Sequence, residues 1–394
     1  MMKTNNRAGS LGLYIHIPFC LQKCHYCDFY SEAGTASSLR AKYVDALCTE
    51  IQYFGDLLGH GAAEGGRLVD TVFIGGGTPS ILEVSQTVQI VSTIFDSFRV
   101  AEDAEISMEC NPATLTAEKL AAYRKAGINR LSMGVQSMDL SVLKIMGRVH
   151  KPQDVTDNFR LAREAGFDNI NLDVMFGVPG QDMNIWKDTV QTVLEMEPEH
   201  LSFYSLELAE GTEFYRRLAS GMLKETAPEE DRKMYHWLLE ELDRRGYEHY
   251  EISNAAKNGC QCRHNLKYWN LEDYLGLGAA AHSFIANRRF SNPPDVPAYV
   301  ESWQEGKPAV DWHQENTWED SVTDYTFTAL RRVKGIRKKD FAEKFGRTFW
   351  DVFAERKSEF ETYKAAGDAA EDGENLWITR QGMDIASEII ALFI

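Results

Sequence analysis

The sequence lacks the features of a membrane protein, a disulfide-bonded protein or a nucleic-acid binder. No stretch reaches the ~18–20 uncharged apolar residues of a membrane span, and no apolar signal segment follows the polar N-terminus, so we expect a cytoplasmic protein. Seven cysteines in 394 residues, an odd number, argue against a disulfide framework. The net charge of −17 argues against binding to nucleic acid, whose affinity comes largely from phosphate neutralisation.

Three of the seven cysteines lie close together near the N-terminus. Cys20, Cys24 and Cys27 have the spacing Cys-x3-Cys-x2-Cys within the segment YIHIPFCLQKCHYC, residues 14–27. A cubane iron–sulfur cluster normally takes four thiolates, so three thiolates leave one iron open to a ligand. Structural zinc usually takes two separated pairs of ligands, and no second tight pair lies at a suitable distance. The spacing therefore predicts a [4Fe-4S] cluster with three cysteine ligands.

Strand-like and helix-like segments alternate over roughly the first 210 residues. Such βα units predict an α/β protein, with a parallel sheet and helices outside it. About six units fit, and the pattern alone leaves open whether the sheet closes fully or partly into a barrel. The strand candidates are 11–17, 68–74, 105–110, 130–135, 169–176 and 201–206. The helix candidates are 38–58 (capped by Ser38), 83–98, 116–126, 152–165, 183–196 and 227–245.

The composition changes near residue 290. Residues 291–316 contain four prolines among polar residues, which predicts a linker or surface excursion. The tail suggests a small α/β unit, with a helix at 336–345, a strand at 377–379 and a last helix at 381–393. That order is typical of a winged-helix-like module. We therefore expect three parts, residues 1–290, 291–316 and 317–394.

Several polar residues lie where the predicted strands end. Gly75, Gly76 and Gly77 directly follow one strand, and glycine lets the backbone approach a ligand closely. Glu109, Gln136 and Asp173 lie near the ends of later strands, and functional side chains of βα barrels gather at that face. The carboxylates there can accept from ribose hydroxyls or pair with an ammonium group, and Arg148 can bind a carboxylate. A turn without ligand, ordinary structural hydrogen bonds and a surface arginine are the alternatives.

An aromatic segment follows Cys260 and Cys262. His264, Tyr268 and Trp269 combine an imidazole with flat rings, and imidazole is a common haem ligand. From composition alone we favour a barrel-closing loop around a hydrogen-bonded core histidine. A metal site that includes the two cysteines is less favoured still. The remaining cysteines, Cys48 and Cys110, are expected to be small core residues.

Taken together, the motifs resemble those of the radical S-adenosylmethionine (SAM) family. YIHIPFC, GGGTPS, GVQS, DVMFGVPG and HNLKYW are similar to segments of oxygen-independent coproporphyrinogen III oxidase (HemN) and of the related HemW-like haem chaperones. The resemblance covers essentially the whole chain. The oxidase pattern continues as Cys-x3-Cys-x2-Cys-x-Cys, whereas Phe29 occupies the last position here. This departure favours the chaperones and argues against porphyrinogen decarboxylation.

The resemblance implies a fold and a set of site residues. The fold is a partial (β/α)6 radical SAM barrel, with the cluster at the C-terminal ends of the strands and a small HemN-type C-terminal domain. The resemblance implies Cys20, Cys24 and Cys27 as cluster ligands, SAM on the open iron and haem near His264. The positions that match SAM-binding residues are Tyr14, Tyr26, Gly76, Gly77, Thr78, Glu109, Gln136, Arg148 and Asp173, and those near the haem are His264, Tyr268 and Trp269.

Two functions follow from the resemblance. The first is a haem chaperone that carries haem to respiratory or other haem apoproteins, with the cluster and SAM as structural or regulatory parts. The second is a radical SAM enzyme that forms a 5′-deoxyadenosyl radical and acts on a porphyrinogen. Whether the protein is an enzyme stays open at this stage, as do a homodimer and peripheral membrane contact through partners. A third hypothesis, RNA modification guided by the tail, conflicts with the net acidity.

Overall fold

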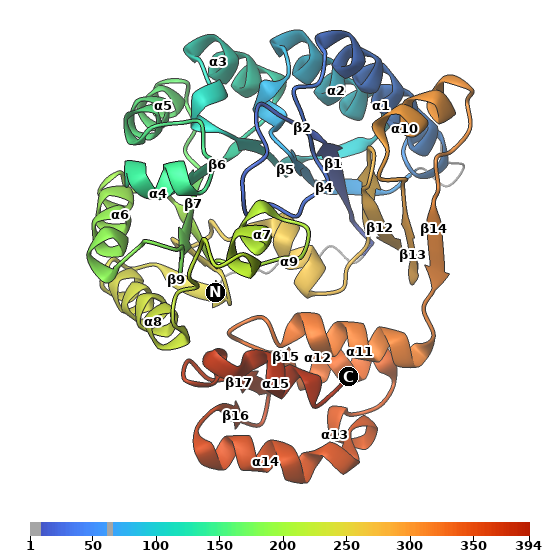
Figure 1. Ribbon diagram of the computed structural model, residues 1–394. Coiled ribbons are helices and arrows are strands. Elements are labelled where there is room, and N and C mark those ends of the chain that lie inside the picture. The colour runs from blue at the N-terminus through green and yellow to red at the C-terminus, as the bar shows by residue number, and fades with distance from the viewer. Residues whose placement is uncertain (1–8, 61–65) are drawn as a thin grey trace. The chain divides into compact units, whose positions relative to one another are not determined.

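The computed structural model describes residues 9–60 and 66–394 (Figure 1). The chain divides into two compact units. The first unit contains Met1–Leu238 and Asp273–His313, and the second contains Leu239–Glu272 and Gln314–Ile394. The chain thus leaves the first unit, returns to it for about forty residues and leaves it again. No helix among the described residues is both long and apolar enough to cross a bilayer.

The core of the first unit is a parallel sheet whose strands follow one another in space as they do in the chain. Each of the six strands pairs in parallel with the next. This arrangement confirms the predicted α/β class, and it is the one expected of a partial (β/α)6 barrel. The strands are β1 (Leu11–Ile17), β4 (Leu68–Gly76), β5 (Arg99–Cys110), β6 (Arg130–Gln136), β7 (Ile170–Phe176) and β8 (His200–Ser205).

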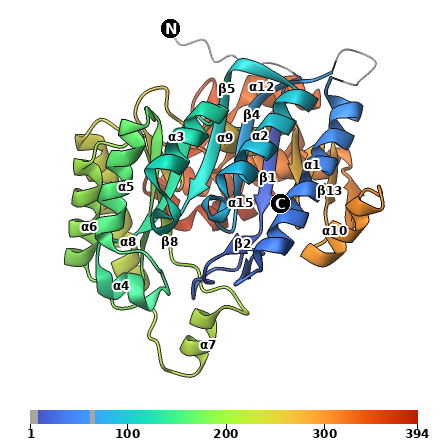
Figure 2. The ribbon, with the colours of Figure 1, turned by 90° about the horizontal axis from the view of Figure 1, so that it is seen from above.

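Helices connect the strands and cover the outer face of the sheet (Figures 1 and 2). The long ones are α1 (Ser37–Leu58), α2 (Val84–Ser97), α3 (Ala117–Ala126), α5 (Pro152–Glu164) and α6 (Met183–Glu195). Two shorter helices, α4 (Leu140–Ile145) and α7 (Glu213–Ala219), were not predicted. The prediction that Ser38 caps α1 is wrong, because the helix begins at Ser37 after Ala36, whose side chain makes no capping hydrogen bond.

The segment 273–313 extends the sheet on the other side of β1. Strand β11 (Tyr274–Leu277) pairs in parallel with β1, and β12 (His282–Ile285) and β13 (Arg288–Ser291) continue it as antiparallel strands. Helix α10 (Val296–Gln304) then lies against α1. The proline-rich stretch 291–316 therefore contains a packed helix.

A buried carboxylate joins this returning segment to α1. Glu50 of α1 accepts hydrogen bonds from the Gly278 amide (2.7 Å), from Asn292 Nδ2 (2.7 Å) and from the Tyr299 hydroxyl. Its side chain is completely buried, and burial raises the pKa of the carboxyl group to about 7. Three donors from the returning segment thus depend on one acceptor.

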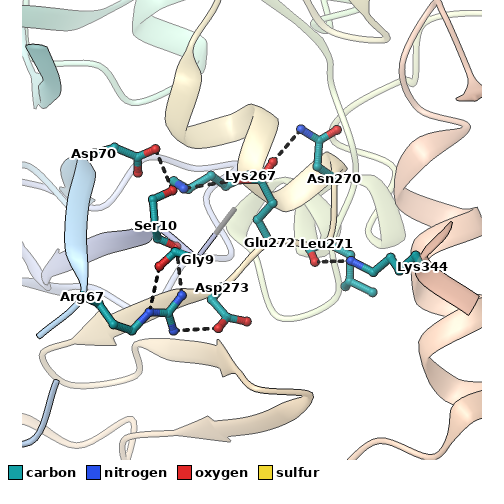
Figure 3. Close-up of polar contacts among 10 residues, drawn as sticks. All are labelled: Gly9, Ser10, Arg67, Asp70, Lys267, Asn270, Leu271, Glu272, Asp273 and Lys344. Atoms are coloured by element: carbon teal, nitrogen blue, oxygen red, sulfur yellow. Dashed lines mark hydrogen bonds and ion pairs between the residues drawn. The ribbon is translucent and has the colours of Figure 1, made fainter. Parts of the chain in front are cut away.

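An ion pair connects the N-terminal ends of strands β1, β4 and β11. Arg67, just before β4, pairs with Asp273, just before β11, at 2.6 Å (Figure 3). The same guanidinium donates to the backbone oxygens of Gly9 and Ser10, at 3.2 and 2.9 Å. Ser10 Oγ also donates to Asp70 of β4 at 2.8 Å. These contacts hold the starts of β1, β4 and β11 together.

The second unit combines a β-hairpin with a small helical and sheet region. Strands β9 (Glu248–Glu251) and β10 (Asn254–Ala256) are antiparallel and precede α9 (Arg263–Trp269). Within this unit Glu272 accepts from Lys267 and Asn270, and Lys344 donates to the backbone oxygen of Leu271 (Figure 3). Helix α8 (Pro228–Arg244) and strand β14 (Trp312–Glu315) contain points where the chain passes from one unit to the other.

The C-terminal part of this unit is built around a three-stranded antiparallel sheet of β15 (Ile336–Arg337), β17 (Asn375–Ile378) and β16 (Ala369–Glu371), in that order. The ring of Phe349 packs against those of Phe341 and Phe393, with centroid distances of 5.2 and 5.3 Å. The predicted helix 336–345 is β15 followed by α12, and the predicted last helix is a 3₁₀ turn followed by α15. The elements are α11 (Trp318–Ala329), β15 (Ile336–Arg337), α12 (Lys338–Phe345), α13 (Phe349–Val352), α14 (Lys357–Ala366), β16 (Ala369–Glu371), β17 (Asn375–Ile378) and α15 (Ala386–Ala391).

Replacing Glu50 with alanine should destabilise the first unit. The substitution leaves three buried donors without their acceptor, so we expect the free energy of unfolding in urea to fall by about 3 kcal/mol. Thr49→Ala, at the exposed neighbouring position of α1, should change it by less than ~0.5 kcal/mol.

The loss of stability caused by Glu50→Ala should also depend on pH. The folded-state pKa of Glu50, about 7, lies above its unfolded value, so the folded protein binds the extra proton between these values. The stability that this carboxyl group contributes is therefore lost as the pH rises through about 7. The difference between wild type and Glu50→Ala should be larger at pH 5 than at pH 8, and a gap that widens with pH would contradict the assignment.

Candidate functional site

The three N-terminal cysteines lie on a loop that follows β1 directly. Two short parallel strands, β2 (Phe19–Cys20) and β3 (Glu32–Ala33), bring the ends of this cysteine loop, residues 18–34, together. Within it the Cys27 amide donates to the Cys24 oxygen at 3.3 Å. All three thiols are free and partly exposed. Burial, and to a smaller extent the neighbouring thiols, raise the pKa of Cys20 and of Cys27. The loop thus presents three thiols at the C-terminal end of the sheet.

The three thiols are the donor set of a cubane cluster with one open iron. Across residues 9–60 and 66–394, no three His, Cys, Asp or Glu side chains converge as ligands for one metal ion. A cubane does not need such convergence, because each of its cysteine thiolates bonds a separate iron. Burial raises the pKa of the Cys27 thiol to about 11, so cluster binding must displace a proton there. The donor set therefore fits a [4Fe-4S] cluster.

The glycine motif at the end of β4 lies against the cysteine loop. The Gly77 amide donates to the Ile17 oxygen at 2.9 Å, and the Thr78 amide donates to the Phe19 oxygen at 2.8 Å. A Cβ atom on Gly77 would lie 2.8 Å from the Phe19 oxygen and 3.1 Å from the Cys20 sulfur. The Thr78 hydroxyl lies 3.6 Å from that sulfur. Glycine is needed at residue 77 because the two backbones come this close.

Two strand ends meet at Gly76. Its φ of +112° is strained for any side chain, and its amide donates to Glu109 Oε2 at 3.0 Å. Burial, and next the charge of Asp173, raise the pKa of Glu109 to about 8. Tyr14 of β1 contacts His16 Nδ1 through its hydroxyl at 2.9 Å, and burial raises its pKa. These polar groups gather where β1, β4 and β5 end.

Arg148 and Gln136 occupy the space above Gly134 of β6. Arg148 donates to the Gly134 oxygen at 2.6 Å and, through Nη1, to the Cys24 sulfur at 3.5 Å. A Cβ atom on Gly134 would lie 3.0 Å from Arg148 Nη2 and 3.1 Å from Gln136 Nε2. Gln136 itself has a φ of +63°, and its buried Oε1 has no hydrogen-bond partner in the protein. An orphaned acceptor beside a guanidinium and a thiol fits a site that receives a ligand.

The structure thus brings the predicted cluster and SAM residues into one place. They lie on the cysteine loop, on β1, β4, β5, β6 and β7 or directly after β4, and, for Arg148, on the segment that follows α4. Asp173 of β7 accepts from Asn171 Nδ2 at 2.7 Å, and burial raises its pKa. The Tyr26 ring lies near the ring of Phe214 of α7, and the Phe214 amide donates to the His25 oxygen at 2.8 Å. Helix α7 therefore braces the cysteine loop.

The predicted haem residues lie in the second unit, on α9. His264 is buried, with 1% of its surface exposed, and its Nε2 contacts the Tyr268 hydroxyl at 2.8 Å. The Arg331 guanidinium stacks over the Trp269 ring at 4.8 Å. Cys262 before this helix is buried, and no three-ligand metal site was found here among the described residues.

Some residues of the site were missed by the sequence argument. His16 contacts Tyr14, and His25 anchors the cysteine loop through the Ile145 oxygen at 2.7 Å. Asn171 contacts Asp173. The alternation of side chains along a strand could have identified two of them. His16 and Asn171 each lie two residues from a predicted site residue, and therefore on the same face of the strand as that residue. No comparable pattern marks His25 in its loop.

Comparison with known proteins places this site in a family. Residues 14–193 match the radical SAM superfamily, and residues 319–385 match the HemN C-terminal domain. Heme chaperone HemW of Bacillus subtilis is 37% identical over 389 residues, which cover 97% of this chain and 98% of that protein. This chain belongs to the HemW family. The HemW proteins of Lactococcus lactis and Haemophilus influenzae are each 30% identical to it and also match over nearly their full lengths.

The fold agrees with this assignment to the HemW family. The solved structure of coproporphyrinogen III oxidase (HemN) from Escherichia coli matches with a TM-score of 0.84 and covers 98% of this chain and 90% of that one. At 24% identity this likeness shows the fold alone. Membership of the radical SAM superfamily implies a [4Fe-4S] cluster and SAM as cofactors of the HemW family.

Replacing Gly77 with alanine should reduce cluster loading. The new Cβ would clash with the Phe19 oxygen and with the Cys20 sulfur, so the cysteine loop must move. After anaerobic reconstitution we expect iron and sulfide content per chain to fall at least about twofold, as a packing clash of this size requires local rearrangement. Gly373→Ala, where a Cβ meets nothing within 4 Å, is the matched control and should load like wild type. Normal loading of the Gly77 variant would show that the close approach is not required.

Proposed function

We propose that this protein is a haem chaperone, which binds haem and transfers it to haem apoproteins, respiratory ones among them. The identity to proteins named Heme chaperone HemW supports this most, because it runs through both units of the chain. Phe29 agrees with it, since it replaces the further cysteine of the oxidase pattern and its side chain is 65% exposed. We propose cytoplasmic action and no nucleic-acid partner.

The first unit is proposed to hold the cofactors. A [4Fe-4S] cluster on Cys20, Cys24 and Cys27 would supply an open iron for the amino and carboxylate groups of SAM. Arg148 lies beside the Cys24 sulfur, so its positive charge would offset the negative charge of the thiolates. The orphaned Gln136 Oε1 would accept a hydrogen bond from the ligand. The remaining predicted contacts to SAM are proposed to come from Tyr14, Tyr26, Gly76, Gly77, Thr78, Glu109 and Asp173.

The second unit is proposed to bind haem close to α9. His264 would be the iron ligand, with the rings of Tyr268 and Trp269 beside the porphyrin. Because His264 Nε2 contacts the Tyr268 hydroxyl, ligation through Nε2 requires that this contact breaks. Haem binding should therefore be coupled to a local rearrangement of α9.

Haem titration tests the chaperone function. Purified reconstituted protein should bind about one haem per chain, with a shifted Soret band. His264→Ala should weaken binding at least about tenfold if it loses an axial ligand. His313→Ala, at an exposed position, is the control and should bind like wild type. Absence of stoichiometric haem binding by the wild-type protein would contradict the chaperone function. Wild-type haem affinity of His264→Ala would contradict only the assignment of His264 as the iron ligand.

A radical SAM enzyme acting on a porphyrinogen is the second candidate. The predicted SAM residues gather at the C-terminal ends of the parallel strands, which favours this function. This function requires reductive cleavage of SAM to methionine and 5′-deoxyadenosine. We expect that the reduced, reconstituted protein does not release 5′-deoxyadenosine in amounts that depend on coproporphyrinogen III. Substrate-dependent release, with loss of carboxylate groups from the porphyrinogen, would establish the enzyme instead.

A further inference from the structure

Below the proposed SAM site, polar side chains replace the apolar ones expected inside a barrel. Three neighbouring strands place polar residues opposite one another in the sheet register. Ser132 of β6 is paired with Asn171 of β7, which is paired with His200 of β8. All three side chains are buried, with exposed fractions of 6%, 1% and 0%. Buried polar groups of this kind are costly unless each finds a partner.

The Asn171 amide satisfies this requirement completely. Its Nδ2 donates to Asp173 Oδ1 at 2.7 Å and to Ser132 Oγ at 2.7 Å. Its Oδ1 accepts from Ser202 Oγ at 3.1 Å and contacts His200 Nδ1 at 2.6 Å. An amide has two N–H groups and two lone pairs, so all four of its positions are used.

These partners also fix the direction of the amide. The Asp173 carboxylate accepts hydrogen bonds, so it requires the NH₂ end of Asn171. The carbonyl end then faces His200 and Ser202, and His200 must carry its proton on Nδ1 to bond it. The network therefore has one consistent orientation from β8 to the Asp173 carboxylate.

Asp173 lies one step closer than Asn171 to the C-terminal end of β7. Its register partners are Gly134, the residue beneath Arg148 and Gln136, and Ser202. Asn171 therefore contacts the carboxylate from the side away from the proposed ligand. Ser132 Oγ adds only long contacts, 3.5 Å to each carboxylate oxygen.

We propose that Asn171, oriented by His200 and Ser202, is a positioning residue that holds the Asp173 carboxylate for SAM. In this proposal the amide binds Oδ1, and Oδ2 is the carboxylate oxygen left for the ligand. This inference rests on the SAM site of the proposed function. It assigns to the polar interior of β6, β7 and β8 a role in ligand affinity besides its role in folding.

SAM binding to reconstituted Asn171→Leu tests the proposal. Leucine has the same branched shape as asparagine, is somewhat larger, and makes no hydrogen bonds. The affinity for SAM should therefore fall about tenfold, the usual effect of losing one hydrogen bond to a charged group. Iron content should stay at the wild-type level. The change that SAM causes in the electron paramagnetic resonance spectrum of the reduced cluster should require correspondingly more SAM. Asn158→Leu is the control, because Asn158 is a buried asparagine whose Nδ2 bonds only backbone oxygens, of Pro112 and Asp154.

A pair of variants at His200 separates positioning from folding. His200→Asn retains a donor at the place of Nδ1 and should retain SAM affinity, whereas His200→Leu removes the donor and should weaken binding severalfold. Equal SAM affinity of the two variants, or wild-type affinity of Asn171→Leu, would overturn the positioning role. Failure of the wild-type protein to bind SAM would instead overturn the SAM site itself. Wild-type haem binding by Asn171→Leu is expected, since α9 belongs to the other unit.

Discussion

The close approach of β4 to the cysteine loop is the constraint on which the site depends. Gly77 lets the end of β4 lie against Phe19 and Cys20, and Gly76 lets its amide bond Glu109. Without these contacts the thiols would not lie over the strand ends, and Arg148 would not reach the Cys24 sulfur. The parallel sheet supplies the rest, because its register brings the ends of β5, β6 and β7 to the same edge.

Charge balance at this edge explains its unusual composition. Burial raises the pKa of both Glu109 and Asp173, so the isolated protein does not favour two ionised carboxyl groups here. The positive charge of Arg130 opposes this shift at both carboxyl groups, and that of Arg148 opposes it at Asp173. Asn171 donates a hydrogen bond to Asp173. Such a site gains from a ligand that carries both positive charge and hydrogen-bond donors. SAM, with its sulfonium, ammonium and ribose hydroxyls, has this chemistry.

The sequence predicted the six consecutive parallel strands, because most of them are short apolar runs that end in polar or glycine residues. It missed the charged first half of β5, residues 99–104, and the strands β11, β12 and β13 that extend the sheet. It predicted the cluster loop from the cysteine spacing, and the site residues from their places at strand ends. It did not reveal that residues 239–272 leave the first unit, because no proline-rich stretch marks either boundary of this segment. It also missed α4 and α7, which are short, and the helix within the proline-rich segment 291–316. Their formation depends on packing, such as that of Phe214 against the cysteine loop.

The central claim is that the radical SAM scaffold here serves haem transfer. The most direct test loads the reconstituted protein with one equivalent of haem under anaerobic conditions. The loaded protein is mixed directly with an apo-cytochrome and, in parallel, is separated from it by a membrane that free haem crosses but proteins do not. The account predicts transfer only with direct contact, together with no coproporphyrinogen-dependent 5′-deoxyadenosine. A protein that binds no haem but forms 5′-deoxyadenosine when coproporphyrinogen III is added would contradict it.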